Sequence, residues 1–196
     1  APSNCSSSQA NWGTWSIAVG GEQLLGTYAN PANGIIFVED HLWINGQINT
    51  ARLTIAAGRF PDSSSTWRDI TINNDLLYTN YDGQDVLGLM TQRNINIGMV
   101  SENDLRIDAA VVAQNGRVGR FYYRGPSGQG CSPYHSRSTI TLYGMIGTSQ
   151  RYGFAYTDGT GYITRNIIYD GNLLYAPPPY FPLTSDQYST VFWREL

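Results

Sequence analysis

Three short segments of this chain repeat one alternating pattern of apolar and polar residues at equal spacing. Residues 70–73, 105–108 and 140–143 each read apolar, polar, apolar, polar, and each segment begins 35 positions after the one before. Alternation with a period of two is typical of a strand with one buried face. Equal spacing favours a chain wound into coils, with each strand stacked on the equivalent strand of the next coil. The sequence therefore predicts an all-β, parallel, right-handed β-helix, or β-solenoid.

A second repeat supports the same interpretation. Residues 70–78 resemble residues 167–175, and both segments close on Leu-Leu-Tyr. No apolar stripe with the helical period of 3.6 residues runs for a useful length, so we expect little helix. Strands are predicted over residues 35–38, 42–48, 53–55, 69–73, 86–91, 94–97, 105–108, 111–113, 118–122 and 139–142. Gly46, Ala109 and Ala110 are small, and we expect them at the bends of the coils.

We expect a single domain with three parts, because 196 residues suffice for one sizeable core. Residues 1–34 are rich in Ser, Asn and Gly and predict an irregular arm with a short strand over 15–19. Residues 35–175 hold the predicted coils. Residues 176–196 contain a triple proline, which lacks the donor for a central ladder, so this part is expected to lie extended across the body. Its apolar stretch 190–194 is predicted to cover an exposed end of the solenoid.

The surface implied by the composition is polar but carries few charges. Charged residues make up 14% of the chain, and the formal net charge is −3. Binding to phosphates requires clustered cations, so we expect neither nucleic acid nor an anionic membrane as a partner. All 12 cationic side chains are Arg and none is Lys. Schiff-base chemistry and a phosphate-binding lysine are therefore excluded.

Several features predict an exported protein. No run approaches the ~20 apolar residues of a membrane helix. The first residues have neither the basic nor the apolar part of a signal peptide, so we expect a mature form. Cys5 and Cys131 lie in Ser-, Gly- and Pro-rich sequence, which is typical of a disulfide in an exported protein. We predict a Cys5–Cys131 bridge, which in the chain-entropy model stabilises the fold by roughly 4–5 kcal/mol. The alternative is two free thiols.

Four runs of sequence resemble those of one family. Residues 37–46, 85–90, 104–116 and 169–182 resemble the β-solenoid domain of bacterial surface proteins related to pilus-assembly, pilin-like proteins. The resemblance covers about residues 35–196, and its most specific part is the Leu-Leu-Tyr segment followed by the triple proline. It implies a solenoid that follows a hydrophobic pilin-like helix, which this sequence does not contain. It implies no catalytic residues.

One cluster of charged residues is the best candidate for an active site. Arg106 and Asp108 lie two positions apart on one predicted strand, so we expect both side chains on its outward face. Glu102 and Asp104 come just before them. Carboxylates and arginines on a solenoid flank suit a polysaccharide lyase or hydrolase, in which they bind a cation or transfer a proton. The alternative is a structural Arg–Asp pair, which contributes only a few tenths of a kcal/mol on a sheet surface.

Aromatic side chains form a second candidate site. The chain contains 14 Tyr and 5 Trp. Aromatic faces together with Asn and Gln amides suit neutral glycans, which offer CH faces and hydroxyls but no charge. The candidate binding residues are Trp43, Tyr122, Tyr123, Tyr143 and Tyr152. The alternative is a stack of aromatic rings that stabilises the coils themselves.

No other motif predicts chemistry. His41 stands beside two acids and His135 lies far away in the sequence, whereas zinc needs three or four converging ligands, so we expect no metal. No nucleophile motif or nucleotide-binding loop occurs, and no cofactor is expected. The sequence favours an extracellular, non-catalytic surface module for structure, adhesion or filament formation. Its expected partners are copies of itself, pilus or cell-surface proteins, and neutral glycans. The alternative is an extracellular carbohydrate-active protein that binds or cleaves a glycan.

Overall fold

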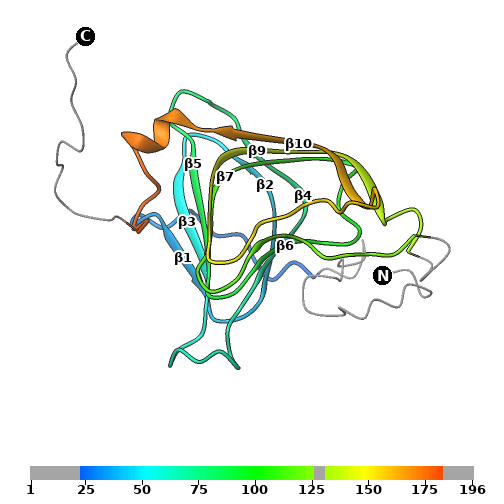
Figure 1. Ribbon diagram of the computed structural model, residues 1–196. Helices are drawn as coiled ribbons and strands as arrows, with labels where there is room; N and C mark the ends of the chain where they lie inside the picture. Colours follow the sequence, from blue (N-terminus) through cyan, green and yellow to red (C-terminus); the bar gives the residue numbers. More distant parts are fainter. Residues whose placement is uncertain (1–22, 126–130, 183–196) are drawn as a thin grey trace, which may run out of the picture.

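The computed structural model describes residues 23–125 and 131–182, and the regular structure within these ranges is almost entirely β (Figure 1). The strands are β1 (Ile35–Val38), β2 (Leu42–Ile48), β3 (Arg52–Ala57), β4 (Ile70–Tyr78), β5 (Val86–Thr91), β6 (Ile95–Ile97), β7 (Asp104–Ala113), β8 (Val118–Arg120), β9 (Ser136–Thr148) and β10 (Gly161–Tyr169), followed by the 3₁₀ helix η1 (Gly171–Leu174). Every pairing between these strands is parallel, and an isolated bridge between Ala155 and Gly161 is antiparallel. The prediction of an all-β fold is confirmed, and its sheet is mostly parallel.

Five strands form the first side of the molecule. β1, β3, β5 and the second halves of β7 and β9 lie next to one another in this order. One continuous row of paired residues crosses all five strands, namely Val38, Ala57, Thr91, Ala113 and Thr148. Each of these residues is the last of its strand, so the chain leaves the first side at the same level five times.

Two further sides complete the arrangement. The second side consists of the first halves of β2 and β4 with β6 and β8. The third consists of the second halves of β2 and β4, the first halves of β7 and β9, and β10. A register shift between Ile44 and Gly46 divides β2 between these sides, and Gly46 has a φ of 127°, as predicted for a bend. In Figure 1 the strands superpose into three sides around a common interior.

Alternating side chains from these sides fill the interior. On the third side, Leu105 pairs with Ile140 and Ile107 pairs with Leu142, and all four are buried. Their sequence neighbours point the other way because successive residues of a strand face opposite sides of the sheet. Each fully buried Leu or Ile contributes roughly 1.5–3 kcal/mol to the free energy of unfolding. The apolar alternation in the sequence therefore marks the core.

The predicted 35-residue spacing is correct for one pair of strands. Leu105 on β7 pairs with Ile140 on β9, as expected. Ile70 on β4 pairs with Ile95 instead of Leu105, so the prediction of one fixed repeat is wrong. The physical reason is the unequal length of the connections. Three residues separate β5 from β6, whereas 12 separate β3 from β4.

Two other details of the predicted repeat differ from the structure. The predicted strands 105–108 and 111–113 are one continuous strand, β7, which passes from the third side to the first at the buried Ala109 and Ala110. The first Leu-Leu-Tyr segment ends β4, whereas the second forms the end of η1, so the two are not equivalent. A shared Leu-Leu-Tyr sequence does not specify the same conformation when the flanking residues form different turns.

The proline-rich segment contacts the first side, but the expectation that it is extended is wrong over residues 178–181, where the backbone N–H of Phe181 donates to the carbonyl oxygen of Pro178 and Tyr180 has a φ of 56°. Thr54 Oγ1 donates a hydrogen bond to the carbonyl oxygen of Pro179. Gly88 on β5 lies beneath the segment, and a Cβ at this position would stand 2.8 Å from Pro178. The missing side chain therefore lets the segment approach the sheet closely. We call residues 176–182 the strap.

Three predictions fall on residues outside the described ranges. They are the short strand over 15–19, the Cys5 end of the proposed disulfide, and the apolar cap over 190–194. Residues 23–33 contain no strand.

Candidate functional site

Asp108, one of the four charged residues of the candidate active site, is fully buried. Its Oδ2 accepts hydrogen bonds from the backbone N–H of Tyr78 at 3.0 Å and from the hydroxyl of Tyr81 at 2.7 Å. Its Oδ1 accepts from Arg106 Nε at 2.8 Å. The two side chains contact each other on the face of β7 opposite Leu105 and Ile107, as expected, but this face does not leave Asp108 open to solvent. The segment that follows β4 carries Tyr81 over the outward face and covers it.

Arg106 is held by the same group of side chains. Its guanidinium carbon lies 5.3 Å from the ring centre of Tyr81 and 6.0 Å from that of Tyr143. The two rings meet edge to face at 5.4 Å, and the Tyr143 hydroxyl donates to Asp170 Oδ1 at 3.1 Å. Burial raises the pKa of both tyrosines above the ordinary value for this side chain. The arginine is thus fixed by cation–π contacts and an ion pair.

The two remaining acids of this cluster are engaged or exposed. Glu102 Oε1 accepts a hydrogen bond from Asn74 Nδ2 at 2.9 Å. Asp104 is exposed at the start of β7. Nearby, Asp75 Oδ1 accepts from the backbone N–H of Arg106 at 2.7 Å, and burial raises the pKa of Asp75. Most of these carboxylates therefore serve as acceptors that join one strand to the next.

A second series of polar side chains links the successive connections between the first and second sides, and we call it the corner ladder. His41 Nδ1 accepts from the backbone N–H of Asp69 at 3.1 Å, Asp69 Oδ1 accepts from that of Asn94 at 2.8 Å, and Asn94 Oδ1 accepts from that of Arg117 at 3.0 Å. Asp69 also forms an ion pair with Arg93 at 2.6 Å. The series ends at Arg117 because a guanidinium has no acceptor to offer the next turn.

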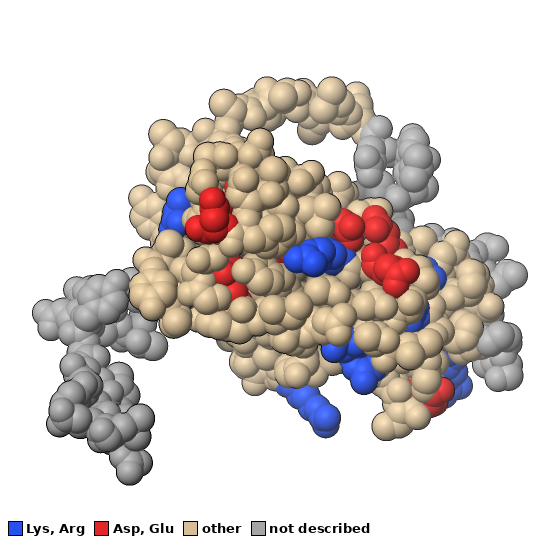
Figure 2. Space-filling model, turned by 90° about the horizontal axis from the view of Figure 1, so that it is seen from above, with Lys and Arg blue, Asp and Glu red and all other residues tan. Residues whose placement is uncertain are grey.

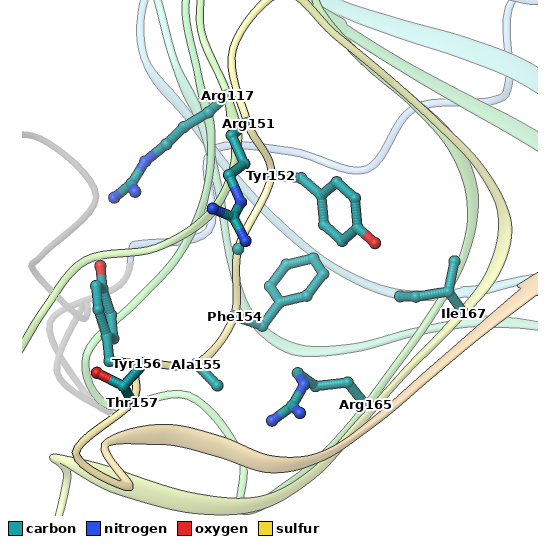
Figure 3. A pocket seen from close by; sticks show the side chains of 10 residues that line it. Arg117, Arg151, Tyr152, Phe154, Ala155, Tyr156, Thr157, Arg165 and Ile167 are labelled. Atoms are coloured by element: carbon teal, nitrogen blue, oxygen red, sulfur yellow. The ribbon is translucent and has the colours of Figure 1, made fainter.

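A cleft of about 860 Å³ opens beyond the end of the corner ladder, beside β10 (Figure 3). Among the described residues, β9 is the only strand that pairs with β10, so β10 forms the last strand of the third side. The cleft is lined by three arginines, Arg117, Arg151 and Arg165, by the rings of Tyr152, Phe154 and Tyr156, and by Ile167. None of the four charged residues of the predicted active site lines it.

Arg165 occupies a position that belongs to the core in the preceding strands. It pairs with Ile140, which in turn pairs with Leu105, and both of these are buried. Arg165 Nη1 donates to the carbonyl oxygens of Tyr162 at 2.8 Å and Ile163 at 2.9 Å. A cation therefore replaces an aliphatic side chain at the last strand, and the interior ends in a polar opening.

The cleft is positively charged. No Asp or Glu is among its lining residues, and none of its three arginines forms an ion pair within the described residues. Arg117 donates to the carbonyl oxygen of Arg120 at 3.3 Å and lies over the ring of Phe121 at 5.1 Å. In Figure 3, Arg151 enters the cleft from the turn after β9 and Arg165 enters from β10. Figure 2 shows that charged side chains are sparse on the face seen there.

The five aromatic residues predicted to bind glycans lie on different parts of the molecule. Tyr152 lines the cleft and is 49% exposed. Tyr122 packs edge to face on Tyr156, a cleft residue that sequence reasoning missed, at 4.9 Å. Trp43 is half-buried on β2, and Tyr143 is half-buried beside Arg106. The expectation that Tyr123 lies on the surface is wrong, because it is 1% exposed.

Tyr123 packs instead against a buried arginine that the sequence did not reveal. Arg120 on β8 has 0% of its surface exposed, and its guanidinium lies 4.8 Å from the ring centre of Tyr123. Burial lowers the pKa of Arg120 to about 10. The charge is compensated by hydrogen bonds to Gly98, Met99, Ser101 and Tyr134. No carboxylate takes part in these bonds, so a search for opposite charges in the sequence would not have found the site.

His41 and His135 have different hydrogen-bond partners. His41 belongs to the corner ladder, and the backbone N–H of His135 donates to the carbonyl oxygen of Cys131. Among the described residues, no group of three or more His, Cys, Asp or Glu side chains is arranged to hold a metal ion. Cys131 is fully buried beside Met99 and Tyr123. The bridge to Cys5 stays a prediction.

Comparison with protein-family models, with curated proteins and with solved structures found no match for this chain. Within residues 23–125 and 131–182, no helix has the length and apolar character needed to cross a membrane.

Proposed function

We propose that this chain is a non-catalytic adhesive module of the cell surface, built on a right-handed parallel β-solenoid. The solenoid is supported by the three sides, to which the chain returns in the same order with parallel pairing. A right-handed path is the usual one for parallel strands joined by crossover connections. The strap then runs back over the first side, which it covers in part.

The buried carboxylate cluster supports a role without catalysis. A general acid or base must reach a bound substrate, whereas Asp108 is fully buried and its oxygens already accept three hydrogen bonds. A hydrolase of glycosidic bonds also needs two carboxyl groups facing one space. The cleft beside β10 contains no carboxylate.

The cleft is the observation that carries an adhesive role. It combines three arginines with two tyrosines at one end of the molecule, where a ligand can enter without disturbing the strands. Clefts that unite aromatic rings with a few fixed polar groups are the usual form of a ligand site. The resemblance to pilus-related surface proteins points to the same kind of function.

Location on intact cells tests this proposal. Antibodies raised against the folded chain should label living cells of the native organism without permeabilisation, and brief surface proteolysis should remove the label. Labelling that appears only after permeabilisation contradicts the proposal.

A polysaccharide lyase is the second candidate, and the same cleft favours it over a hydrolase. Elimination from a uronic acid requires a cation to neutralise the sugar carboxylate and a group that moves a proton, and Arg and Tyr side chains have these properties. The cleft offers both residue types and no carboxylate pair.

A further inference from the structure

We infer that the cleft beside β10 binds a carboxylated glycan, and that Arg151 and Arg165 recognise its carboxylates. The inference rests on the proposed adhesive function and names the class of ligand. It departs from the neutral glycans that the aromatic composition predicts.

The cationic groups of the cleft are available to a ligand. Arg151 and Arg165 are exposed, and neither forms an ion pair within the described residues. Arginines in earlier connections are used internally, since Arg68 pairs with Asp40 at 3.3 Å and Arg93 pairs with Asp69 at 2.6 Å. The planar guanidinium fork matches a carboxylate in a bidentate arrangement. Two such groups entering one cleft from different elements favour a ligand that carries negative charge.

The remaining lining residues favour a sugar. Tyr152 and Phe154 lie close together at 6.2 Å between ring centres, and the half-exposed Tyr152 offers a face for the CH groups of a pyranose. The volume of about 860 Å³ falls within the range of small-molecule sites, roughly 300–1,000 Å³, and leaves room for more than one sugar ring.

Nucleic acid fits the same observations less well. A phosphate chain needs a continuous track of cations, whereas these arginines are confined to one cleft of a chain with a net charge of −3. Asp158 stands near the rim, where Tyr122 donates to it at 2.6 Å, and it would repel a backbone that left the cleft on that side. A short acidic oligosaccharide avoids this repulsion.

The test is a titration calorimetry series with oligogalacturonides, hyaluronan oligosaccharides and sialyllactose, with fully methyl-esterified oligogalacturonide as the uncharged counterpart. We expect at least one carboxylated sugar to bind and the ester to bind at least about tenfold more weakly. Arg151→Gln and Arg165→Gln should each weaken binding about tenfold, and Arg59→Gln should leave it unchanged because that exposed arginine lies in the connection between β3 and β4. Added salt should weaken binding by screening.

Three results would overturn the inference. They are equal affinity for the acid and its ester, tighter binding of a short oligothymidylate than of any carboxylated sugar, and no binding of any of these sugars at millimolar concentration. Circular dichroism confirms that each variant is folded. If none of these sugars binds but antibodies label intact cells, only the ligand class is rejected. If antibodies do not label intact cells, the proposed function is rejected.

Discussion

The hydroxyl of Tyr81 donates a hydrogen bond of 2.7 Å to the buried carboxylate of Asp108. Through this bond a residue of the connection between β4 and β5 covers a charge on β7 that would otherwise face solvent. The same carboxylate also joins β7 to β4 through the backbone N–H of Tyr78. The pair therefore shows how this fold uses its acids, as acceptors that hold neighbouring strands together.

Replacing this carboxylate should destabilise the protein. In Asp108→Asn the side chain places an NH₂ group toward donors that now lack an acceptor, so we expect the free energy of unfolding to fall by about 2–4 kcal/mol. Urea denaturation followed by circular dichroism measures the change. Asp104→Asn, on the same strand but exposed, is the control and should shift stability by less than about 0.5 kcal/mol. Equal effects of the two variants would contradict the structural role of Asp108.

The corner ladder should make stability depend on pH. Burial lowers the pKa of His41 below 6.5, and Arg68 and Arg93 add to this while Asp69 and Asp40 oppose it. The unfolded chain therefore binds more protons at this site, and the stability that neutral His41 contributes is present above pH 6.5 and falls as the pH drops below that value. Protonation also removes the Nδ1 acceptor that Asp69 uses. His41→Gln, which does not titrate, should flatten the stability profile between about pH 7.5 and 5.5. An unchanged profile in this variant would show that other groups cause the dependence.

A side chain added beneath the strap should weaken its packing on β5. Gly88→Val puts a Cβ at 2.8 Å from Pro178 and 3.0 Å from Phe181, so the strap must move away from β5. We expect a loss of about 1–3 kcal/mol from overpacking and faster hydrogen exchange in the strap. Gly171→Ala is the control, because an added Cβ there meets nothing within 4 Å. If the strap of Gly88→Val exchanges hydrogen at the wild-type rate, the close contact between the strap and Gly88 does not keep the strap in place.

Arg165 should protect the exposed edge of β10 from association. Ile163, Ile167, Ile168 and Tyr169 on this strand are each more than 40% exposed, and a charge that points inward at an edge strand disfavours pairing with another chain. We expect wild type and Arg165→Gln to remain monomeric in multi-angle light scattering at micromolar concentration. Arg165→Leu should form concentration-dependent oligomers. Oligomers of the wild type would favour the filament hypothesis instead.

The fold class could be predicted from the alternation of apolar and polar residues along the chain. The candidate site could not, because it depends on which residues distant in sequence lie next to each other. The alternation around Leu105 and Ile140 predicted buried strands because period-two patterning depends only on neighbouring residues. The pairing of Ile70 with Ile95 escaped the prediction because connection lengths are not encoded in that alternation. The prediction placed Asp108 on the correct face of its strand. It did not foresee that Tyr81 covers this carboxylate.

Of the cleft residues, Tyr152 was predicted as a binding residue, whereas the arginines were not. Arg151 lies in an irregular segment after β9, and Arg165 lies in a stretch of β10 that was not recognised as a strand. One signal was present. Arg165 interrupts an otherwise apolar position that Leu105 and Ile140 fill in the preceding strands, and an alignment of the strands by register would have exposed it.

We propose that this chain binds a glycan without cleaving it. The most direct measurement incubates the wild-type protein with a panel of neutral and acidic polysaccharides and follows both new reducing ends and the ultraviolet absorbance of unsaturated products. We predict no product above a heat-denatured control, including with those polysaccharides that bind. Product formation that Arg165→Gln or Tyr152→Phe abolishes in a folded variant would contradict the account and establish a lyase in the same cleft.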